Sequence, residues 1–184
     1  MTLEEKIKFE ERIKLFGNIT PLVLSSQIRY NNRIRIKDED LAQHSYYVAY
    51  NILHAGHVFN IKKEIIQEAV CRSIFHDLDE QFTSDIPHDC KILYPELKEM
   101  VSKIGLEFIK KKASFATEYF IAYSEKEDLA NLLVDIGDGI SVLQYVNREI
   151  ELGNKTDAIK VILLEIKTRL YCLFEKLENY KEEL

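Results

Sequence analysis

A histidine and an aspartate stand side by side at His76–Asp77, where a predicted helix ends. Ile66, Ala69 and Ser73 recur at helical spacing before the pair and place it on or beside the inward face of that helix. An imidazole next to a carboxylate at such a position suits a divalent cation. The dipeptide alone is weak evidence for a metal site, because short pairs of common residues also arise by chance.

A second histidine, His44, lies in the apolar stripe of the preceding predicted helix. The stripe is formed at spacings of three and four residues by Leu41, Val48, Ile52 and Ala55. A lone histidine in such a stripe is more often a core residue with a satisfied hydrogen bond than a metal ligand. Taken by itself, His44 leaves both interpretations open.

Asp138 lies within LLVDIGDGISVLQYV, a helix that otherwise has the composition of a buried segment. A buried carboxylate without a partner is costly, so Asp138 requires a cation or hydrogen bonds. Gly137 and Gly139 flank it, and each costs about 1 kcal/mol in a helix interior, which makes sense where another backbone or a bound group approaches closely. The alternative is tight helix packing with Asp138 bonded to a tyrosine or lysine, and Asp135, one turn earlier, is the competing carboxylate.

Helices must position these residues, because apolar residues recur at helical spacing almost throughout the chain. The predicted helices span about 3–16, 21–27, 41–59, 62–76, 95–112, 124–152 and 156–181. Residues 29–40 have the pattern of a loop or short extended piece, and residues 77–91 that of an ordered loop. With no repeat and no linker, residues 1–184 are expected to form a single all-α domain, a bundle of about six to eight helices.

Capping residues mark several of the helix ends. Thr2 with Glu5, and Ser124 with Glu127, have the spacing of capping boxes. Asp40 is a further candidate N-cap. Gly153 and the asparagine after it are a typical stop between the last two helices.

Composition and charge restrict the class of protein. The 46% apolar and 30% charged residues are ordinary for a soluble globular domain. No apolar run reaches the roughly 18 to 20 residues of a membrane span, and the charged N-terminus does not resemble a secretory signal. Three cysteines without CxxC spacing favour reduced thiols, so we expect a cytoplasmic protein with no membrane partner. The net charge of −6 disfavours a nucleic-acid polymer as partner but allows a small anionic substrate.

Taken together, His44, His76–Asp77 and Asp138 occur in the order and approximate spacing of the HD superfamily, which the chain resembles. The segments RYNNRIRIKDEDLAQHS and HDLDEQFTSDIPHDCK are similar to the bacterial 5'-deoxynucleotidase family. In that family an arginine, an aromatic residue, an EHS-like element, HDxxE, TGDxP and a lysine occur in this order. GDGISVLQYVNREIELGN resembles the family's AD…L…E…GN helix and selects Asp138 over Asp135. The resemblance covers about residues 29–154.

Two residues depart from the family's pattern. Gln43 stands where a glutamate usually precedes the histidine, and Ser84 stands where a glycine usually precedes Asp85. Neither change removes a ligand. The resemblance implies an HD-domain helical bundle, a small-molecule nucleotide substrate and a homodimer.

The resemblance also implies a role for each site residue. Glu80 would orient or deprotonate the attacking water, and Asp85 would assist the sugar-side oxygen as it leaves. Arg29 would clamp the phosphate, Lys91 would add positive charge, and Tyr30 would lie beside the sugar. One divalent ion would be bound, and cobalt, manganese, zinc and magnesium all suit imidazole and carboxylate ligands. The implied ligands are His44, His76, Asp77 and Asp138.

These roles describe phosphate-ester hydrolysis, since a metal polarises a phosphoryl oxygen, an arginine fork stabilises charge and carboxylates transfer protons. The first hypothesis is hydrolysis of deoxyribonucleoside 5'-monophosphates, and the enzymatic rival is hydrolysis of deoxynucleoside triphosphates. A rival of another class is a non-catalytic helical regulatory module that keeps a structural metal. The intact catalytic and phosphate-binding residues argue against that module. His88 lies near the implied site and could touch substrate, whereas surface or capping roles are expected for His54 and His57.

Overall fold

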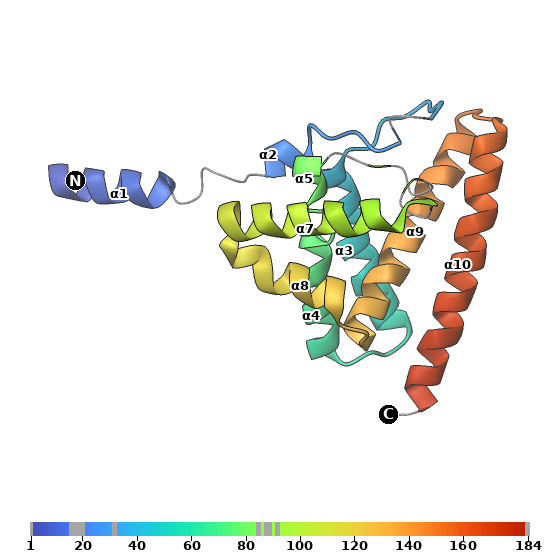
Figure 1. The fold of residues 1–184 in the computed structure, drawn as a ribbon. Coiled ribbons are helices and arrows are strands. Elements are labelled where there is room, and N and C mark those ends of the chain that lie inside the picture. The colour runs from blue at the N-terminus through green and yellow to red at the C-terminus, as the bar shows by residue number, and fades with distance from the viewer. Residues whose placement is uncertain are drawn as a thin grey trace.

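The computed structural model describes residues 2–14, 21–30, 33–83, 86, 90 and 93–182. In this part of the chain the regular structure is helical, and extended pairing is limited to one isolated antiparallel bridge between Ile28 and Asp40. Seven of the described helices have nine residues or more. The expectation of an all-α bundle is therefore confirmed (Figure 1).

The bundle is built around α9 (Leu129–Glu151), the helix that carries Asp138. Against it pack α3 (Leu41–Val58), α4 (Lys63–Phe75) and α10 (Asp157–Glu182) (Figure 1). Among the described helices, α9 alone is long and apolar enough to cross a membrane, but 67% of its most apolar window is buried inside the protein. It is the core helix of the bundle, since a helix that is apolar on most sides is stable only when neighbours surround it.

Two of the apolar clusters around α9 also include residues of α3. The cluster between α3, α4 and α9 is formed by Val48, Ile52, Ala69, Ala130, Leu133 and Val134. The cluster between α3, α9 and α10 is formed by Ala55, Leu129, Leu132, Ile136, Leu173 and Leu177. The apolar stripe predicted around His44 is therefore a core stripe, and His44 itself is fully buried.

Three further helices, α5 (Glu80–Thr83), α7 (Pro95–Lys112) and α8 (Thr117–Glu125), lie near the end of α4. There α7 and α8 are joined by a short 3-10 helix, Ser114–Ala116. α8 packs on α4, and α7 packs on the four-residue helix α5. The prediction of a loop across residues 77–91 is wrong at α5, where backbone carbonyls of the preceding turn accept the amide hydrogens that form it.

At the N-terminus, α1 (Leu3–Lys14) extends away from the bundle, and the short α2 (Pro21–Leu24) contacts α3 (Figure 1). The predicted capping box is confirmed, because the Thr2 amide donates to the Glu5 carboxylate at 2.7 Å and the Glu5 amide donates to Thr2 Oγ1 at 3.2 Å. The predicted end of this helix near residue 16 lies outside the described residues.

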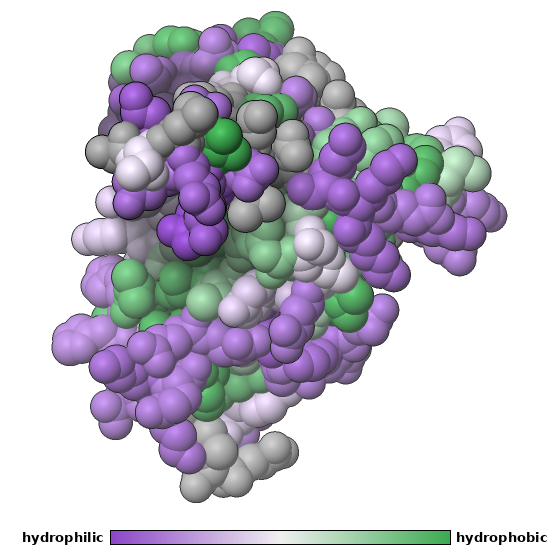
Figure 2. Space-filling model, turned by 90° about the vertical axis from the view of Figure 1, so that its left-hand side faces the viewer, coloured by the Kyte–Doolittle hydropathy of each residue, from purple (hydrophilic) through white to green (hydrophobic). Residues whose placement is uncertain are grey.

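Hydrophilic residues make up most of the face shown in Figure 2, and apolar residues gather in a hollow between them. Elsewhere, α3 exposes large apolar side chains at helical spacing, with Tyr46 at 65%, Tyr50 at 59% and Leu53 at 53% exposure. Such a stripe is compatible with a contact surface. The expected homodimer stays a prediction.

Two predicted helix ends are confirmed by their caps. Asp40 has an extended backbone and its side chain accepts a hydrogen bond from the Gln43 amide at 2.8 Å, as an N-cap should. Gly153 adopts a φ of 99°, the left-handed region that favours glycine, and separates α9 from α10. The isolated bridge at Asp40 also agrees with the short extended piece predicted for residues 29–40.

The predicted helix 124–152 is wrong at its N-terminal end. Ser124 belongs to α8, which the sequence did not indicate, and α9 starts only after Asp128. Asp128 is the N-cap because its carboxylate accepts from the Asn131 amide at 2.9 Å and also binds the Arg72 guanidinium at 2.7 Å. A capping aspartate with a second partner in α4 outcompetes the serine and glutamate of the predicted capping box.

Gly137 and Gly139 allow two helices to approach α9 on either side of Asp138. A Cβ on Gly137 would lie 2.9 Å from the backbone oxygen of Val48 in α3. A Cβ on Gly139 would lie 2.8 Å from Leu170 Cδ2 in α10. The expectation that another backbone approaches these glycines closely is met at Gly137.

Replacing Gly137 with alanine should lower the melting temperature, although alanine is the better helix former. The added methyl group meets a backbone oxygen of α3, and overpacking of this kind costs about 1 to 3 kcal/mol. At roughly 2 to 4 °C per kcal/mol for a domain of this size, thermal unfolding followed by circular dichroism will detect it. Asn147→Ala, at an exposed position of the same helix, is the matched control and should leave the melting temperature unchanged or slightly raised. An unchanged value for Gly137→Ala would contradict the close approach.

Candidate metal centre and active site

His76 and Asp77 follow directly on the last turn of α4. His76 Nδ1 lies 2.7 Å from the backbone oxygen of Ser73, and since a carbonyl can only accept, Nδ1 carries the proton. The Nε2 lone pair is therefore free to bind a cation, and it faces Asp77 Oδ2 at 3.2 Å. A histidine whose other nitrogen is held by a carbonyl is the usual form of a histidine metal ligand.

His44 enters the same space from the first turn of α3. Its Nδ1 lies 3.2 Å from Ser141 Oγ and 3.7 Å from the carboxylate of Glu39, which favours the proton on Nδ1. Its Nε2 faces two carboxylates, Asp138 Oδ1 at 3.2 Å and Asp77 Oδ2 at 3.6 Å. The ring is completely buried, so water does not compensate this arrangement.

Neither Nε2 has a hydrogen-bond partner, although both atoms are buried. An imidazole lone pair directed at ionised carboxylates is unfavourable unless a positive charge lies between them. The candidate ligand atoms of His44, His76 and Asp77 all lie within 4.8 Å of one another. Ligands about 2.0 to 2.2 Å from one ion are separated by roughly 3 to 4.4 Å, so small movements complete the site. The residues present therefore fit a divalent metal ion.

The protonation states also suit metal binding. Burial lowers the pKa of His44 to about 4, and the positive charge of Arg29 acts in the same direction, so the imidazole is neutral at pH 7. Burial raises the pKa of Asp138, but the contact with His44 and the positive charges of Arg169 and Arg29 outweigh it and hold this pKa well below its usual range. The pKa of Asp77 is lowered for similar reasons, against a penalty from burial. Neutral imidazoles and ionised carboxylates are the forms that bind metal.

Asp135, the competing carboxylate, has other partners. Its Oδ1 accepts a hydrogen bond from Tyr123 Oη at 3.3 Å and lies 3.5 Å from Arg169 Nη2. Asp138, by contrast, directs Oδ1 at His44 and Oδ2 at Arg169 Nη1, which lies 2.9 Å away. The alternative of Asp138 bonded to a tyrosine or lysine is not observed among the described contacts, where its cationic partner is an arginine.

Arg29 reaches the site from the segment that precedes α3. Its guanidinium pairs with the buried carboxylate of Glu39 at 3.3 Å and lies 5.2 Å from the centre of the Tyr30 ring. The Tyr30 ring stacks on Tyr145 of α9, with ring centres 4.7 Å apart. Tyr30 has a φ of 56°, an unusual value for a residue other than glycine, and Arg35 Nη1 donates to its carbonyl at 3.0 Å.

Of the remaining predicted catalytic residues, the structure describes Glu80. Glu80 is buried at the start of α5, one turn beyond Asp77, whose carbonyl accepts from the Glu80 amide at 3.1 Å. Asp85, Lys91 and His88 lie outside the described residues. Exposed positions are observed for His54 and His57, as expected.

Glu39 and Glu149 are residues of the site region that sequence reasoning missed. Glu39 links Arg29 to the ring of His44, yet in the charged segment KDED it resembles a solvated loop residue. Glu149 is completely buried, and its carboxylate accepts from the backbone amides of Ile36 at 2.8 Å and Lys37 at 2.7 Å. It thereby fastens the segment between Arg29 and α3 to the C-terminal part of α9. The signal in the sequence was the E…GN part of the family pattern.

Asn154, the last residue of that pattern, completes the attachment. Its side-chain amide donates to the Glu149 carboxylate at 2.8 Å and to the Ile34 carbonyl at 3.1 Å. Its side-chain oxygen accepts from the amide and the hydroxyl of Thr156 at 3.2 and 2.8 Å. One asparagine therefore joins the end of α9, the start of α10 and the segment that leads to the site.

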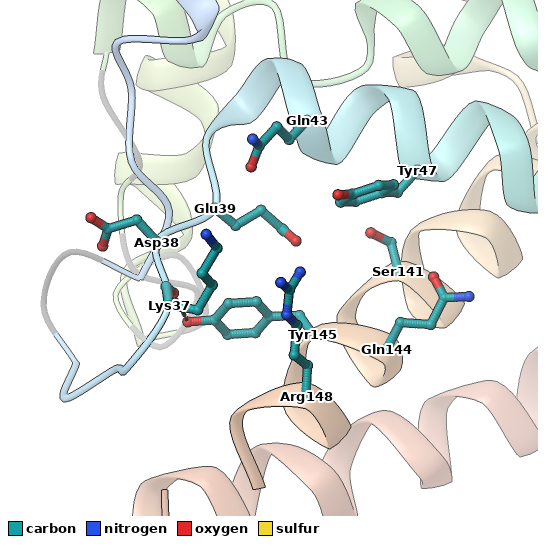
Figure 3. Close-up of a pocket in the computed structure, with 9 residues that line it drawn as sticks. All are labelled: Lys37, Asp38, Glu39, Gln43, Tyr47, Ser141, Gln144, Tyr145 and Arg148. Carbon is teal, nitrogen blue, oxygen red and sulfur yellow. Dashed lines mark hydrogen bonds between the residues drawn. The ribbon is translucent and has the colours of Figure 1, made fainter. Parts of the chain in front are cut away.

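A pocket of about 420 Å³ lies between α3, α9 and the segment before α3 (Figure 3). Ser141 lines it and also contacts His44 Nδ1, so the pocket adjoins the neighbours of this ring. The residues that line the pocket are Lys37, Asp38, Glu39, Gln43, Tyr47, Ser141, Gln144, Tyr145 and Arg148.

Glu149→Gln should lower the free energy of unfolding at neutral pH and change how that free energy depends on pH. Burial raises the pKa of Glu149, but the hydrogen bonds from Asn154 and from two backbone amides lower it below the ordinary 4.5. The carboxylate therefore stabilises the folded state above pH 4.5, and this contribution is lost as the pH falls through the lower, folded-state pKa. An amide leaves one of the buried donors unpaired, at a cost of about 1 to 3 kcal/mol at pH 7.

Urea unfolding at pH 7 and at pH 4 measures both effects. The difference between wild type and Glu149→Gln should be large at pH 7 and smaller at pH 4. Glu151→Gln, on the exposed side of the same helix, should match wild type at both values. A Glu149→Gln variant as stable as wild type at pH 7 would show that the segment is held in some other way.

Solved structures place this bundle among HD-domain proteins. An HD-domain phosphohydrolase from Listeria innocua aligns with a TM-score of 0.73 at 20% identity, over 91% of this chain and 82% of its own. The PH0347 protein from Pyrococcus horikoshii aligns with a TM-score of 0.67 at 24% identity, over 92% and 96%. A cyanophage S-2L HD phosphohydrolase, solved with dA and one catalytic Zn²⁺ ion, aligns with a TM-score of 0.64 at 16% identity, over 91% and 99%. The fold is that of the HD domain.

The family is defined more narrowly by the sequence. Residues 22–172 match the family of YfbR-like 5'-deoxynucleotidases, and the chain belongs to that family. No curated protein sequence matches the chain. The protein is thus an HD-domain hydrolase, a metal-dependent nucleotide phosphohydrolase, and the family resemblance inferred from its motifs is confirmed.

Proposed function

We propose that this protein hydrolyses deoxyribonucleoside 5'-monophosphates to deoxynucleoside and phosphate. The observation that carries the proposal is the pair of buried Nε2 atoms, of His44 and His76, which lack hydrogen-bond partners and face ionised carboxylates. One divalent ion held by His44, His76, Asp77 and Asp138 accounts for this arrangement. The zinc ion of the cyanophage relative makes zinc a natural candidate, while cobalt, manganese and magnesium remain compatible with these ligands.

The bound ion supplies Lewis acidity toward the phosphoryl group and the attacking water. Arg29 binds the phosphate through its guanidinium fork and stabilises the charge that grows on the non-bridging oxygens. Glu39, at 3.3 Å, orients that guanidinium, and burial of the ion pair keeps both groups from turning into solvent. Lys91 adds a second positive charge.

Two carboxyl groups transfer the protons. Glu80, in the buried turn after Asp77, accepts a proton from water as its oxygen bonds to phosphorus. The bond between phosphorus and the 5' oxygen breaks, and Asp85 donates a proton to that oxygen as it leaves. The products are a neutral sugar hydroxyl and inorganic phosphate, so each proton and electron pair is accounted for.

Tyr30 provides the preference for deoxyribose. Its ring is fixed between the Arg29 guanidinium and the ring of Tyr145, which supports its function as a rigid wall. A wall beside the sugar accepts hydrogen at the 2' position and rejects a hydroxyl group, and such steric rejection is worth a few kcal/mol. The protein is expected to act in the cytoplasm on small nucleotides rather than on nucleic-acid polymers, and to do so as a homodimer.

The triphosphohydrolase is the second candidate, because it would use the same metal ligands and the same arginine. A substrate panel distinguishes the two. Chromatography should detect nucleoside and inorganic phosphate from deoxyribonucleoside monophosphates, with ribonucleotides slower by about tenfold or more. Tyr30→Ala should reduce that ratio of kcat/KM values toward one. The proposal would be rejected if the protein hydrolysed only deoxynucleoside triphosphates, with release of triphosphate. Equal kcat/KM values for matched deoxy- and ribonucleotides would also reject it.

Glu80→Ala should lower kcat but leave metal binding unchanged. Loss of a general base lowers kcat by roughly 10² to 10⁴, whereas a residue outside the ligand set leaves the metal content unchanged. Metal analysis of the purified variant and steady-state kinetics measure the two quantities. Gln81→Ala, the next residue of the same short helix, is the control and should retain most of the activity. A Glu80→Ala variant that has lost its metal would make Glu80 a ligand.

A further inference from the structure

The carboxylate of Asp138 is held on both sides. Oδ1 lies 3.2 Å from His44 Nε2, and Oδ2 lies 2.9 Å from Nη1 of Arg169 in α10. The Asp138 side chain is only 16% exposed, so few water molecules compete for it. A carboxylate whose second oxygen is bound by a guanidinium presents its first oxygen in a fixed direction.

Arg169 is fixed in turn by a second carboxylate. Its Nη2 lies 3.5 Å from Asp135 Oδ1, the oxygen to which Tyr123 of α8 donates a hydrogen bond at 3.3 Å. The Tyr123 ring also meets the ring of His76 edge to face, with ring centres 5.8 Å apart. A continuous set of contacts from α8 through α9 to α10 therefore encloses two of the proposed ligands from outside.

The backbone brings α10 close enough for this contact. Leu170, the neighbour of Arg169, packs against Gly139, where a Cβ would lie 2.8 Å from Leu170 Cδ2. Gly139 in turn is the neighbour of Asp138. A larger residue at this position would push α10 outward and lengthen the ion pair. The glycine after Asp138 thus has a specific consequence for the site.

We infer that Arg169 is a positioning residue for the metal centre. It keeps Asp138 Oδ2 turned away from the ion, so that Asp138 binds through Oδ1 alone, and it balances the carboxylate's charge before the metal arrives. Residues that orient a metal ligand in this way commonly change metal affinity by 10- to 100-fold when they are replaced. The inference rests on the proposed function, since it requires that Asp138 is a ligand. It assigns Arg169 to the metal and not to the phosphate.

The test compares Co²⁺ binding to wild type and to Arg169→Met, which keeps the long apolar stem but removes the charge. Competition with a chelator should give a Co²⁺ affinity about 10- to 100-fold weaker in the variant. The visible Co²⁺ spectrum should change, because Asp138 is free to bind through both oxygens. Arg169→Lys should recover part of the affinity but not the wild-type spectrum, since an ammonium group lacks the planar fork.

Lys167→Met is the matched control, because Lys167 is an exposed cation on the same helix. It should leave both the affinity and the spectrum unchanged. Melting temperatures of the metal-free proteins separate these effects from loss of structure. If Arg169→Met does not fold, Asp135→Asn is the second variant, because it weakens the hold on Arg169 without touching Asp138. Asp135→Asn should also lower the Co²⁺ affinity.

The possible failures are distinguishable. Equal Co²⁺ affinity and spectrum in wild type and Arg169→Met, with a raised KM for nucleotide, would make Arg169 a phosphate-binding residue and overturn the inference while leaving the proposed function intact. Equal affinity, spectrum and KM would overturn it as well. Absence of Co²⁺ binding by wild type, tested alongside His76→Ala, would overturn the proposed function and the inference together.

Discussion

Two imidazole nitrogens and two carboxylates share a small volume from which water is largely excluded, and the rest of the structure follows from that constraint. Such a cluster is tolerated in a protein interior only when a positive charge balances it and when each group is held from behind. His44 is held by Ser141 and His76 by the Ser73 carbonyl. Asp138 is held by Arg169. The three supports come from three helices of the bundle, α9, α4 and α10.

The core helix α9 therefore has several functions in one segment. Its apolar side chains form most of the core, and its two glycines let α3 and α10 approach on either side of Asp138. One turn farther, Ser141 contacts His44, and near its end Glu149 anchors the segment that carries Arg29. Asp138, Arg29 and the core are thus positioned by the same helix.

The family pattern gains a physical meaning from these contacts. The aspartate of its last helix faces His44, and the small residues beside it permit close helix packing. The glutamate and the asparagine of the pattern, Glu149 and Asn154, fasten the segment before α3, and Gly153 ends α9 with a positive φ. The pattern thus combines a carboxylate that faces His44 with residues that fasten neighbouring segments.

Much of this was determined by the sequence alone. Helical periodicity and capping residues are local signals, and they predicted the all-α fold and the starts of α1 and α3. The order of His44, His76–Asp77 and Asp138 indicated the HD superfamily, and the segments around these residues indicated the family. Tertiary structure decided what depends on partners distant in the chain. Asp128 became the N-cap of α9 because Arg72 of another helix binds it, and Glu39, Glu149 and Arg169 matter through contacts with residues that local sequence does not bring together. From sequence, a charged side chain is expected to be solvated. Only the tertiary structure shows which charged group it pairs with.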